Sequence, residues 1–140
     1  TESGDADSGR ADRIAAAGAM SRLIGLDIGE VRTGIAVSDE LRLTARPLRT
    51  VSTSELLPEL RQLTEEYAVD TVVVGRPRHL DGGLGTQAAS VDATVDSLRG
   101  RLPVTFVYED ETGTTAASDG TDEGAACVIL QGYLDSQARD

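Results

Sequence analysis

The sequence predicts one α/β domain built on a mixed five-stranded sheet with helices packed against it. The chain has 140 residues, a usual length for a single domain. Near its start, two apolar runs flank a short glycine-containing turn, and the later apolar runs alternate with helical patterns. A hairpin followed by strand–helix units makes the first three strands antiparallel and the later ones parallel.

The antiparallel part is expected within residues 22–51. Residues 22–27 read as a strand that ends at an acid, and Gly29 with Glu30 offers a turn. Residues 33–38 then return as the second strand of a hairpin. After Pro47, residues 48–51 form the expected third strand.

Two helices and a strand follow this part. Ser54 is expected to cap a helix that runs to about Tyr67, with Pro58 tolerated in its first turn. Residues 71–74 are apolar on both faces, as in the middle of a parallel sheet. A loop over 76–85 leads to a second helix, capped by Thr86. Its inner face is predicted to carry the residues Ala88, Val91, Val95 and Leu98.

The last strand and helix complete the order. Residues 104–108 form the strand, which is expected to end before Glu109, Asp110 and Glu111. Thr121 is predicted to cap a final helix running through Leu134. The residues expected on its inner face are Ala125, Val128, Ile129 and Tyr133.

The chain is expected to divide into residues 1–21 as a flexible extension, 22–135 as the domain and 136–140 as a tail. Met20 directly precedes the first strand, so the first 19 residues are either an added extension or the product of a mis-set start. No apolar run is long enough for a membrane helix, and the acidic N-terminus does not resemble a signal peptide. Its apolar neighbours predict that the single cysteine, Cys127, is buried and inert. With no disulfide to form, a cytoplasmic protein is expected.

The composition is strongly acidic. All 13 basic residues are arginine, against 24 acids, for a formal net charge of -11. Such a surface repels polyphosphates at long range and weakens nucleic-acid binding in dilute salt. One hypothesis is adaptation to a high-salt cytoplasm, where charges are screened over about 3 Å at 1 M salt. The alternative is a coding bias towards arginine combined with acidic tails.

Acidic residues lie at the expected carboxyl ends of strands, where sites form in open α/β sheets. Asp27 ends the first strand, Asp110 and Glu111 follow the strand at 104–108, and Asp122 opens the last helix. Carboxylates that converge from separate elements can hold Mg²⁺ or Mn²⁺, and two such ions can promote phosphodiester hydrolysis. Each acid also has a structural interpretation: Asp27 as an Asx turn, Asp122 as a partner of the helix dipole, and the other two as solvated turn residues.

Five segments in order resemble the YqgF/RuvX-like family of pre-16S rRNA nucleases and Holliday-junction-resolvase-like proteins. LIGLDIGEVRTGIAVSD at 23–39 is similar to the family's LxxDxGxxRxGxAxSD, and ARPL at 45–48 to A-x-P-L. VVVGRPRHLDG at 72–82 is similar to VVGLPxNxDG. YEDET at 108–112 resembles the D-E-R segment, and DEGAACVILQGYL at 122–134 resembles the last helix.

The resemblance implies a ribonuclease-H-like fold and a metal-dependent nuclease that acts on pre-rRNA or branched DNA. It implies that the catalytic acids are Asp27, Asp110 or Glu111, and Asp122, with Mg²⁺ or Mn²⁺ held by Asp27, Glu111 and Asp122. Weaker expectations are phosphate contacts from the loop residues Arg32, Arg76, Arg78 and His79. Backbone roles are expected for the motif residues Gly29, Gly34, Gly75, Pro77, Asp81 and Gly82. The protein is expected to be a monomer or a weak dimer.

Two departures from the family pattern keep alternatives open. Thr112 stands where the family has an arginine, which could clamp a phosphate. Residues 113–121 are shorter than the family's connection and contain no basic residue. The second hypothesis is therefore a catalytically degenerate module that binds RNA or protein. A third is an ATP-binding fragment, because the first hairpin also resembles a phosphate loop of sugar kinases and actin-like ATPases.

Overall fold

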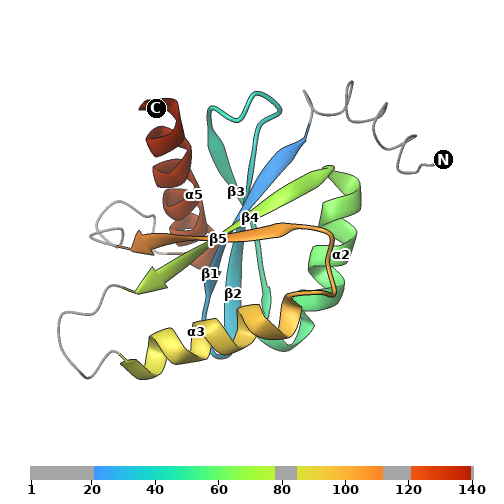
Figure 1. Cartoon of the computed structure of the whole chain (residues 1–140), viewed down its shortest axis with the longest axis vertical. Coiled ribbons are helices and arrows are strands. Elements are labelled where there is room, and N and C mark those ends of the chain that lie inside the picture. The colour runs from blue at the N-terminus through green and yellow to red at the C-terminus, as the bar shows by residue number, and fades with distance from the viewer. Residues whose placement is uncertain (1–20, 78–84, 112–120, 140) are drawn as a thin grey trace.

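The structure, a computed structural model, describes residues 21–77, 85–111 and 121–139 (Figure 1). The predictions for the N-terminal extension, Arg78, His79, Asp81, Gly82 and Thr112 fall outside these residues. The elements in chain order are β1 (Arg22–Ile28), β2 (Arg32–Ser38), β3 (Ala45–Ser52), the short 3-10 helix η1 (Thr53–Glu55), α2 (Leu56–Glu66), β4 (Val69–Pro77), α3 (Gly85–Leu98), β5 (Thr105–Glu111) and α5 (Asp122–Arg139).

The five strands form one mixed sheet in the order β3-β2-β1-β4-β5. β1 and β2 pair antiparallel with Asp27 opposite Gly34, and β3 continues this antiparallel part. β4 pairs parallel with β1, and β5 pairs parallel with β4. The predicted fold class is confirmed, and the topology puts the end of β1 at the centre of the sheet.

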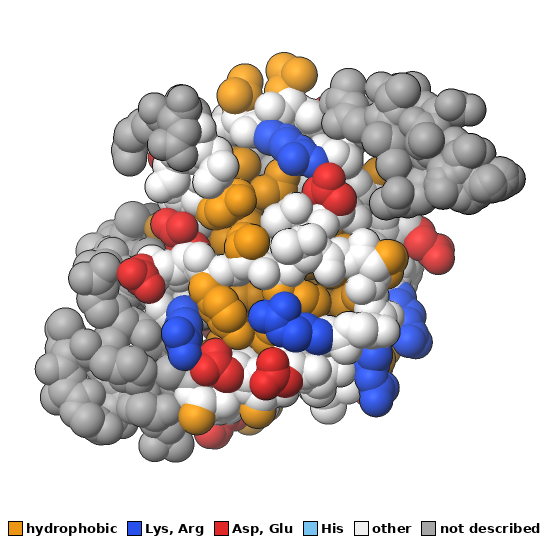
Figure 2. Space-filling model, viewed as in Figure 1, with side chains coloured by type: hydrophobic (Ala, Val, Ile, Leu, Met, Phe, Trp, Pro, Cys, Tyr) orange, Lys and Arg blue, Asp and Glu red, His pale blue; other side chains and the backbone are white. Residues whose placement is uncertain are grey.

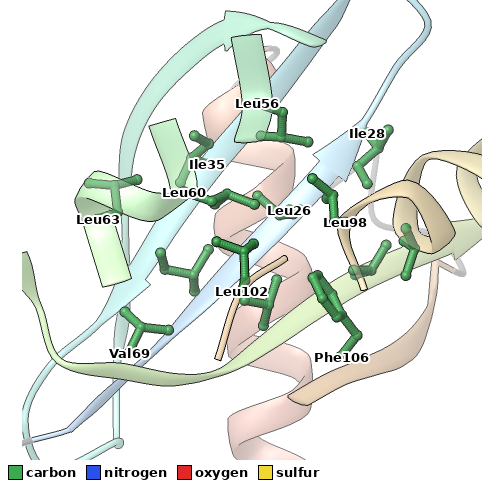
Figure 3. Close-up of a cluster of buried hydrophobic side chains, with 14 of the residues drawn as sticks. Leu26, Ile28, Ile35, Leu56, Leu60, Leu63, Val69, Leu98, Leu102 and Phe106 are labelled. Atoms are coloured by element: carbon green, nitrogen blue, oxygen red, sulfur yellow. The ribbon is translucent and has the colours of Figure 1, made fainter. Parts of the chain in front are cut away.

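Helices cover both faces of the sheet, α2 and α3 on one side and α5 on the other (Figure 1). The larger core lies under α2 and α3, where Leu60 of α2 lies near Leu26 of β1 and Ile35 of β2 (Figure 3). Within α2, the buried positions Leu56, Leu60 and Leu63 recur at helical spacing. The smaller core joins α5 to Leu23, Ala36 and the fully buried Val73 of the central strands. Alternate residues of each strand therefore face opposite helices.

Small residues let α5 lie very close to β1 and β2. A Cβ added at Gly25 would lie 2.7 Å from Leu130 Cβ, and one added at Gly34 would lie 1.9 Å from the Asp122 carbonyl oxygen. Both distances are far below ordinary van der Waals contact, so glycine is required at these positions. The N-terminus of α5 consequently rests directly on the strand beside Asp27.

Several predicted boundaries differ from the structure. Ser54 does not cap the first helix, because η1 precedes α2 and no side-chain cap bond is present there. β4 runs to Pro77 and β5 to Glu111, so the residues expected in the following loops lie in strands. Pairing in register, Arg76 with Asp110, supplies backbone bonds that side-chain polarity does not reveal.

The last helix also differs in length and in its buried face. It continues beyond Leu134 to Arg139, and the apolar side chains that it buries among the described ones are those of Ala126, Ile129, Leu130 and Leu134. Ala125, Val128 and Tyr133 are half-buried. Cys127 is also half-buried, so its predicted burial is wrong. Apolar residues occur around most of this helix, so its sequence did not identify the face that meets the sheet.

Candidate active site

Asp27 is the penultimate residue of β1, on the face covered by α5. Its neighbours Leu26 and Ile28 enter the larger core, so strand alternation turns Asp27 to the opposite side. The side chain is half-buried. Burial raises the pKa of the Asp27 carboxyl, and the negative charge of Asp122 raises it further. The two carboxylates therefore interact electrostatically, although they are 95 positions apart in the sequence.

Asp122 is placed by the start of α5. Thr121 caps the helix as predicted: its Oγ1 accepts a hydrogen bond of 2.9 Å from the Gly124 N–H, and its carbonyl accepts one from Ala125. The close approach at Gly34 fixes the height of this first turn above the sheet. The structure thus brings Asp27 and Asp122, two of the predicted site residues, to one place.

Arg32 is bonded to the site rather than reaching freely into solvent. Its Nε donates a 2.8 Å hydrogen bond to Asp122 Oδ2, while its side chain stays 70% exposed. Arg32 is the first residue of β2 and not a loop residue as predicted, and the turn before it is held by backbone bonds from Gly29 N to Arg32 O and from Thr53 N to Val31 O. Thr53 Oγ1 also donates to the Gly29 carbonyl at 2.7 Å. No sequence pattern indicates the bond between Arg32 and Asp122, because the two residues are 90 positions apart.

The three acids at the end of β5 do not all lie on the same face of the sheet. Val107 packs in the α5 core, so alternation turns Glu109 to that face and Asp110 to the other, away from Asp27. Glu109 Oε2 would lie 3.3 Å from a Cβ at Gly132, well along α5 from Asp122. Burial raises the pKa of Glu109, with a further contribution from Asp110. Glu111 pairs with Pro77 at the end of β5, and its side chain lies outside the described part.

Arg76 makes contacts on the α3 face of the sheet. Its Nη2 donates a 2.8 Å hydrogen bond to Asp92 Oδ2 of α3, and its guanidinium lies over the Tyr108 ring. Among the residues that the structure describes, neither Arg76 Nε nor Asp92 Oδ1, both buried, has a hydrogen-bond partner. Burial raises the pKa of the Tyr108 hydroxyl, and Asp92 adds to that effect. This cluster ties α3 to the sheet on the side opposite Asp27.

The motif glycines serve the backbone. A Cβ at Gly29 would lie 2.6 Å from the Arg32 carbonyl, so the tight turn beside the site requires glycine. Gly75 is buried in β4, next to β1, and Pro77 ends that strand. Asp39, which closes the first motif, holds the β2–β3 turn: its carboxylate accepts bonds from Leu43 N and Thr44 N. These bonds, that from Thr44 first, lower the pKa of Asp39.

Asp27 and Asp122 fit a divalent cation in part. They are hard oxygen ligands on separate rigid elements, and their mutual repulsion is the electrostatic arrangement that a bound cation relieves. Within residues 21–77, 85–111 and 121–139, no three His, Cys, Asp or Glu side chains gather closely enough to hold a metal ion. The pair therefore offers two carboxylate ligands, and water, substrate phosphate or a further side chain would fill the remaining positions around a bound ion.

The order and pairing of the strands and the helices on both faces are those of a ribonuclease-H-like domain, with the candidate site at the end of the first strand. Two solved resolvases share the fold. RuvC from T. thermophilus, in complex with a Holliday junction substrate, has a TM-score of 0.59 at 12% identity, covering 84% of this chain and 96% of that one. The fowlpox virus Holliday junction resolvase has a TM-score of 0.52 at 12% identity, covering 82% and 99%.

The family follows from sequence similarity. The model of the RuvX family, described as a Holliday junction resolvase, matches residues 21–121. Proteins named "Putative pre-16S rRNA nuclease" are similar over most of their length. One from Rubrobacter xylanophilus is 44% identical, with 81% of this chain and 92% of the relative covered, and one from Geobacillus kaustophilus is 38% identical, with 83% and 99% covered. The chain belongs to the RuvX family, and the predicted resemblance is confirmed.

The alignment with the Geobacillus relative spans 136 positions but only 83% of this 140-residue chain, so the relative has residues with no counterpart here. The family match includes the hairpin that also resembles an ATPase phosphate loop, and assigns it to a resolvase family.

A search of the described residues for a helix able to cross a membrane finds none.

Proposed function

We propose that this protein is a metal-dependent endonuclease that hydrolyses phosphodiester bonds in structured nucleic acid, with the 5′ end of pre-16S rRNA as its substrate. The observation that carries the proposal is the half-buried Asp27 facing Asp122 at the end of the central strand. The family and the names of the relatives support a nuclease, and the pre-16S substrate follows those names.

In this proposal Asp27, Asp122 and Glu111 hold Mg²⁺ or Mn²⁺, which activates water and stabilises the leaving oxygen when bound. Water would attack the phosphorus and release a proton to solvent, the bond to the leaving oxygen would break, and that oxygen would take a proton from solvent. Glu111 is the ligand chosen from β5 because Asp110 lies on the other face of the sheet. Gly34 lets the first turn of α5, which carries Asp122, lie close to the sheet, and Thr121 caps that turn.

The charge distribution predicts the conditions for substrate binding. On the face shown in Figure 2, arginines alternate with acidic side chains and form no continuous basic surface among the residues drawn in colour. With a net charge of -11, long-range repulsion of a polyanion is strong in dilute salt. A cytoplasmic, salt-rich setting suits this protein better, because screening weakens repulsion more than it weakens close contacts.

The test is cleavage of labelled RNA. Wild type, Asp27→Asn and Glu111→Gln are incubated in high salt with Mn²⁺ or Mg²⁺ and either a pre-16S leader or a four-way DNA junction. Metal-dependent cleavage of the leader by wild type and its loss in both variants support the proposal. Preferential cleavage of the junction would assign branched DNA as the substrate.

A degenerate binding module remains the second candidate because Thr112 replaces an arginine and the connection after it is short. Tight binding of the leader without cleavage, under every metal and salt condition, would favour that function. The same gel, run under native conditions, separates the two candidates.

A further inference from the structure

We propose that Arg32 acts as a built-in counter-ion that closes Asp122 until a divalent metal ion displaces it. This inference rests on the proposed function, because it assigns Asp122 to the metal site. Arg32 Nε donates to Asp122 Oδ2 at 2.8 Å, so an oxygen needed by a metal ion is already engaged by a cation. A metal ion bound to Asp122 and the Arg32 guanidinium would share one carboxylate and repel one another, so the two cations compete for its negative charge.

The backbone on both sides of the pair is fixed, and the arginine side chain is the part free to move. Thr53 holds the turn through the Gly29 and Val31 carbonyls, and its hydroxyl lies 2.8 Å from that of the fully buried Thr33. On the other side, Gly34 fixes the start of α5. Exchange of cations at Asp122 therefore requires a rotamer change of Arg32 and no movement of the fold.

Because both side chains are partly exposed to water, breaking this ion pair costs little free energy. The side chain of Arg32 is 70% exposed and that of Asp122 33% exposed, so water replaces the bond as soon as it breaks. Exposed ion pairs are weak in solution. Once released, the guanidinium has all its donors available beside the site, and a backbone phosphate of the substrate is the acceptor that suits its planar geometry. The metal would then bind before the nucleic acid is gripped.

The experiment compares Mn²⁺ binding, by calorimetry, in wild type, Arg32→Gln and Asp27→Asn. Arg101→Gln is the matched control, because it removes the same charge from an exposed position just before the start of β5, whereas Glu111 lies at the end of that strand. Arg32→Gln is expected to bind Mn²⁺ about three- to five-fold more tightly than the control, the value of a surface ion pair. Arg32→Lys, which keeps the charge without the Nε bond, is expected to fall between wild type and Arg32→Gln.

A second readout follows Arg32 itself. The NMR signal of the Arg32 Nε–Hε group is assigned by its absence in Arg32→Gln. As Mg²⁺ is added, the chemical shift of this signal is expected to change and its Hε proton to exchange faster with water. If the metal binds and the signal is unchanged, or if Arg32→Gln binds Mn²⁺ no more tightly than the control, Arg32 does not close Asp122. If wild type does not bind Mn²⁺, or if Asp27→Asn binds it as tightly as wild type does, the proposed function itself fails.

Discussion

Replacing Gly34 by alanine tests whether the contact between β2 and α5 positions the site. The added Cβ would lie 1.9 Å from the Asp122 carbonyl oxygen and 2.7 Å from Glu123 N. The gap to that oxygen has to open to at least about 3.0 Å, the lower limit of real Cβ contacts. Because the clash is with backbone, the whole first turn of α5 has to retreat by roughly 1 Å, and overpacking of this kind costs about 1–3 kcal/mol.

A retreat of this size also moves Asp122 away from Asp27. Misplacement by about 1 Å typically costs about 100-fold in rate, so Gly34→Ala is expected to weaken Mn²⁺ binding and reduce cleavage by roughly that factor. Chemical denaturation gives the stability change, and calorimetry gives the metal affinity. Gly132→Ala is the matched control on the same helix: its Cβ would lie 3.3 Å from the flexible end of Glu109, and alanine favours a helix.

The control is expected to keep wild-type metal affinity and to be as stable as wild type or slightly more so. If Gly34→Ala unfolds at the wild-type midpoint and binds Mn²⁺ with wild-type affinity, the close approach of α5 does not position Asp122. The geometry proposed for the site would then be wrong, even if the fold is correct.

Three further outcomes are expected. Because burial and Asp122 raise the folded-state pKa of Asp27, the stabilising contribution of this carboxyl is complete below its unfolded-state pKa and is lost as pH rises through the folded-state pKa. Asp27→Asn is therefore expected to be more stable than wild type in denaturation curves near neutral pH, and the two curves should converge in acid; equal stability at neutral pH would contradict this. Thr121→Ala is expected to lose about 1 kcal/mol with the cap bond to Gly124, and equal midpoints would show that the cap is unimportant. Wild type is expected to melt at a higher temperature in about 2 M KCl than in dilute buffer, because salt screens the net charge of -11, and greater stability in dilute buffer would refute the salt-adaptation hypothesis.

The fold was largely predictable because its signals are local. The hairpin around Gly29, the apolar run at 72–74 and the cap at Thr121 each depend on a few neighbouring residues, and all three are present in the structure. The ends of β4 and β5 were not predictable, because pairing between parallel strands continues through polar residues. The buried face of α5 was missed because that helix is apolar on several sides.

The candidate site was predictable only in its ingredients. The pattern around Asp27 and the acid at the start of the last helix indicated two carboxylates near one end of the sheet. Their interaction, and the bond from Arg32 to Asp122, depend on the glycine at position 34, which lets α5 descend onto the sheet. No local pattern reports a contact between residues 90 positions apart.

Anomalous diffraction from crystals grown with Mn²⁺ locates the metal without depending on the choice of substrate. If Asp27 and Asp122 hold the metal, a manganese peak is expected within about 2.5 Å of a carboxylate oxygen of each, with the Arg32 side chain turned away from Asp122. The peak should vanish in Asp27→Asn. Full occupancy of manganese elsewhere, with these two carboxylates uncoordinated and Arg32 still bonded to Asp122, would contradict the proposed metal site.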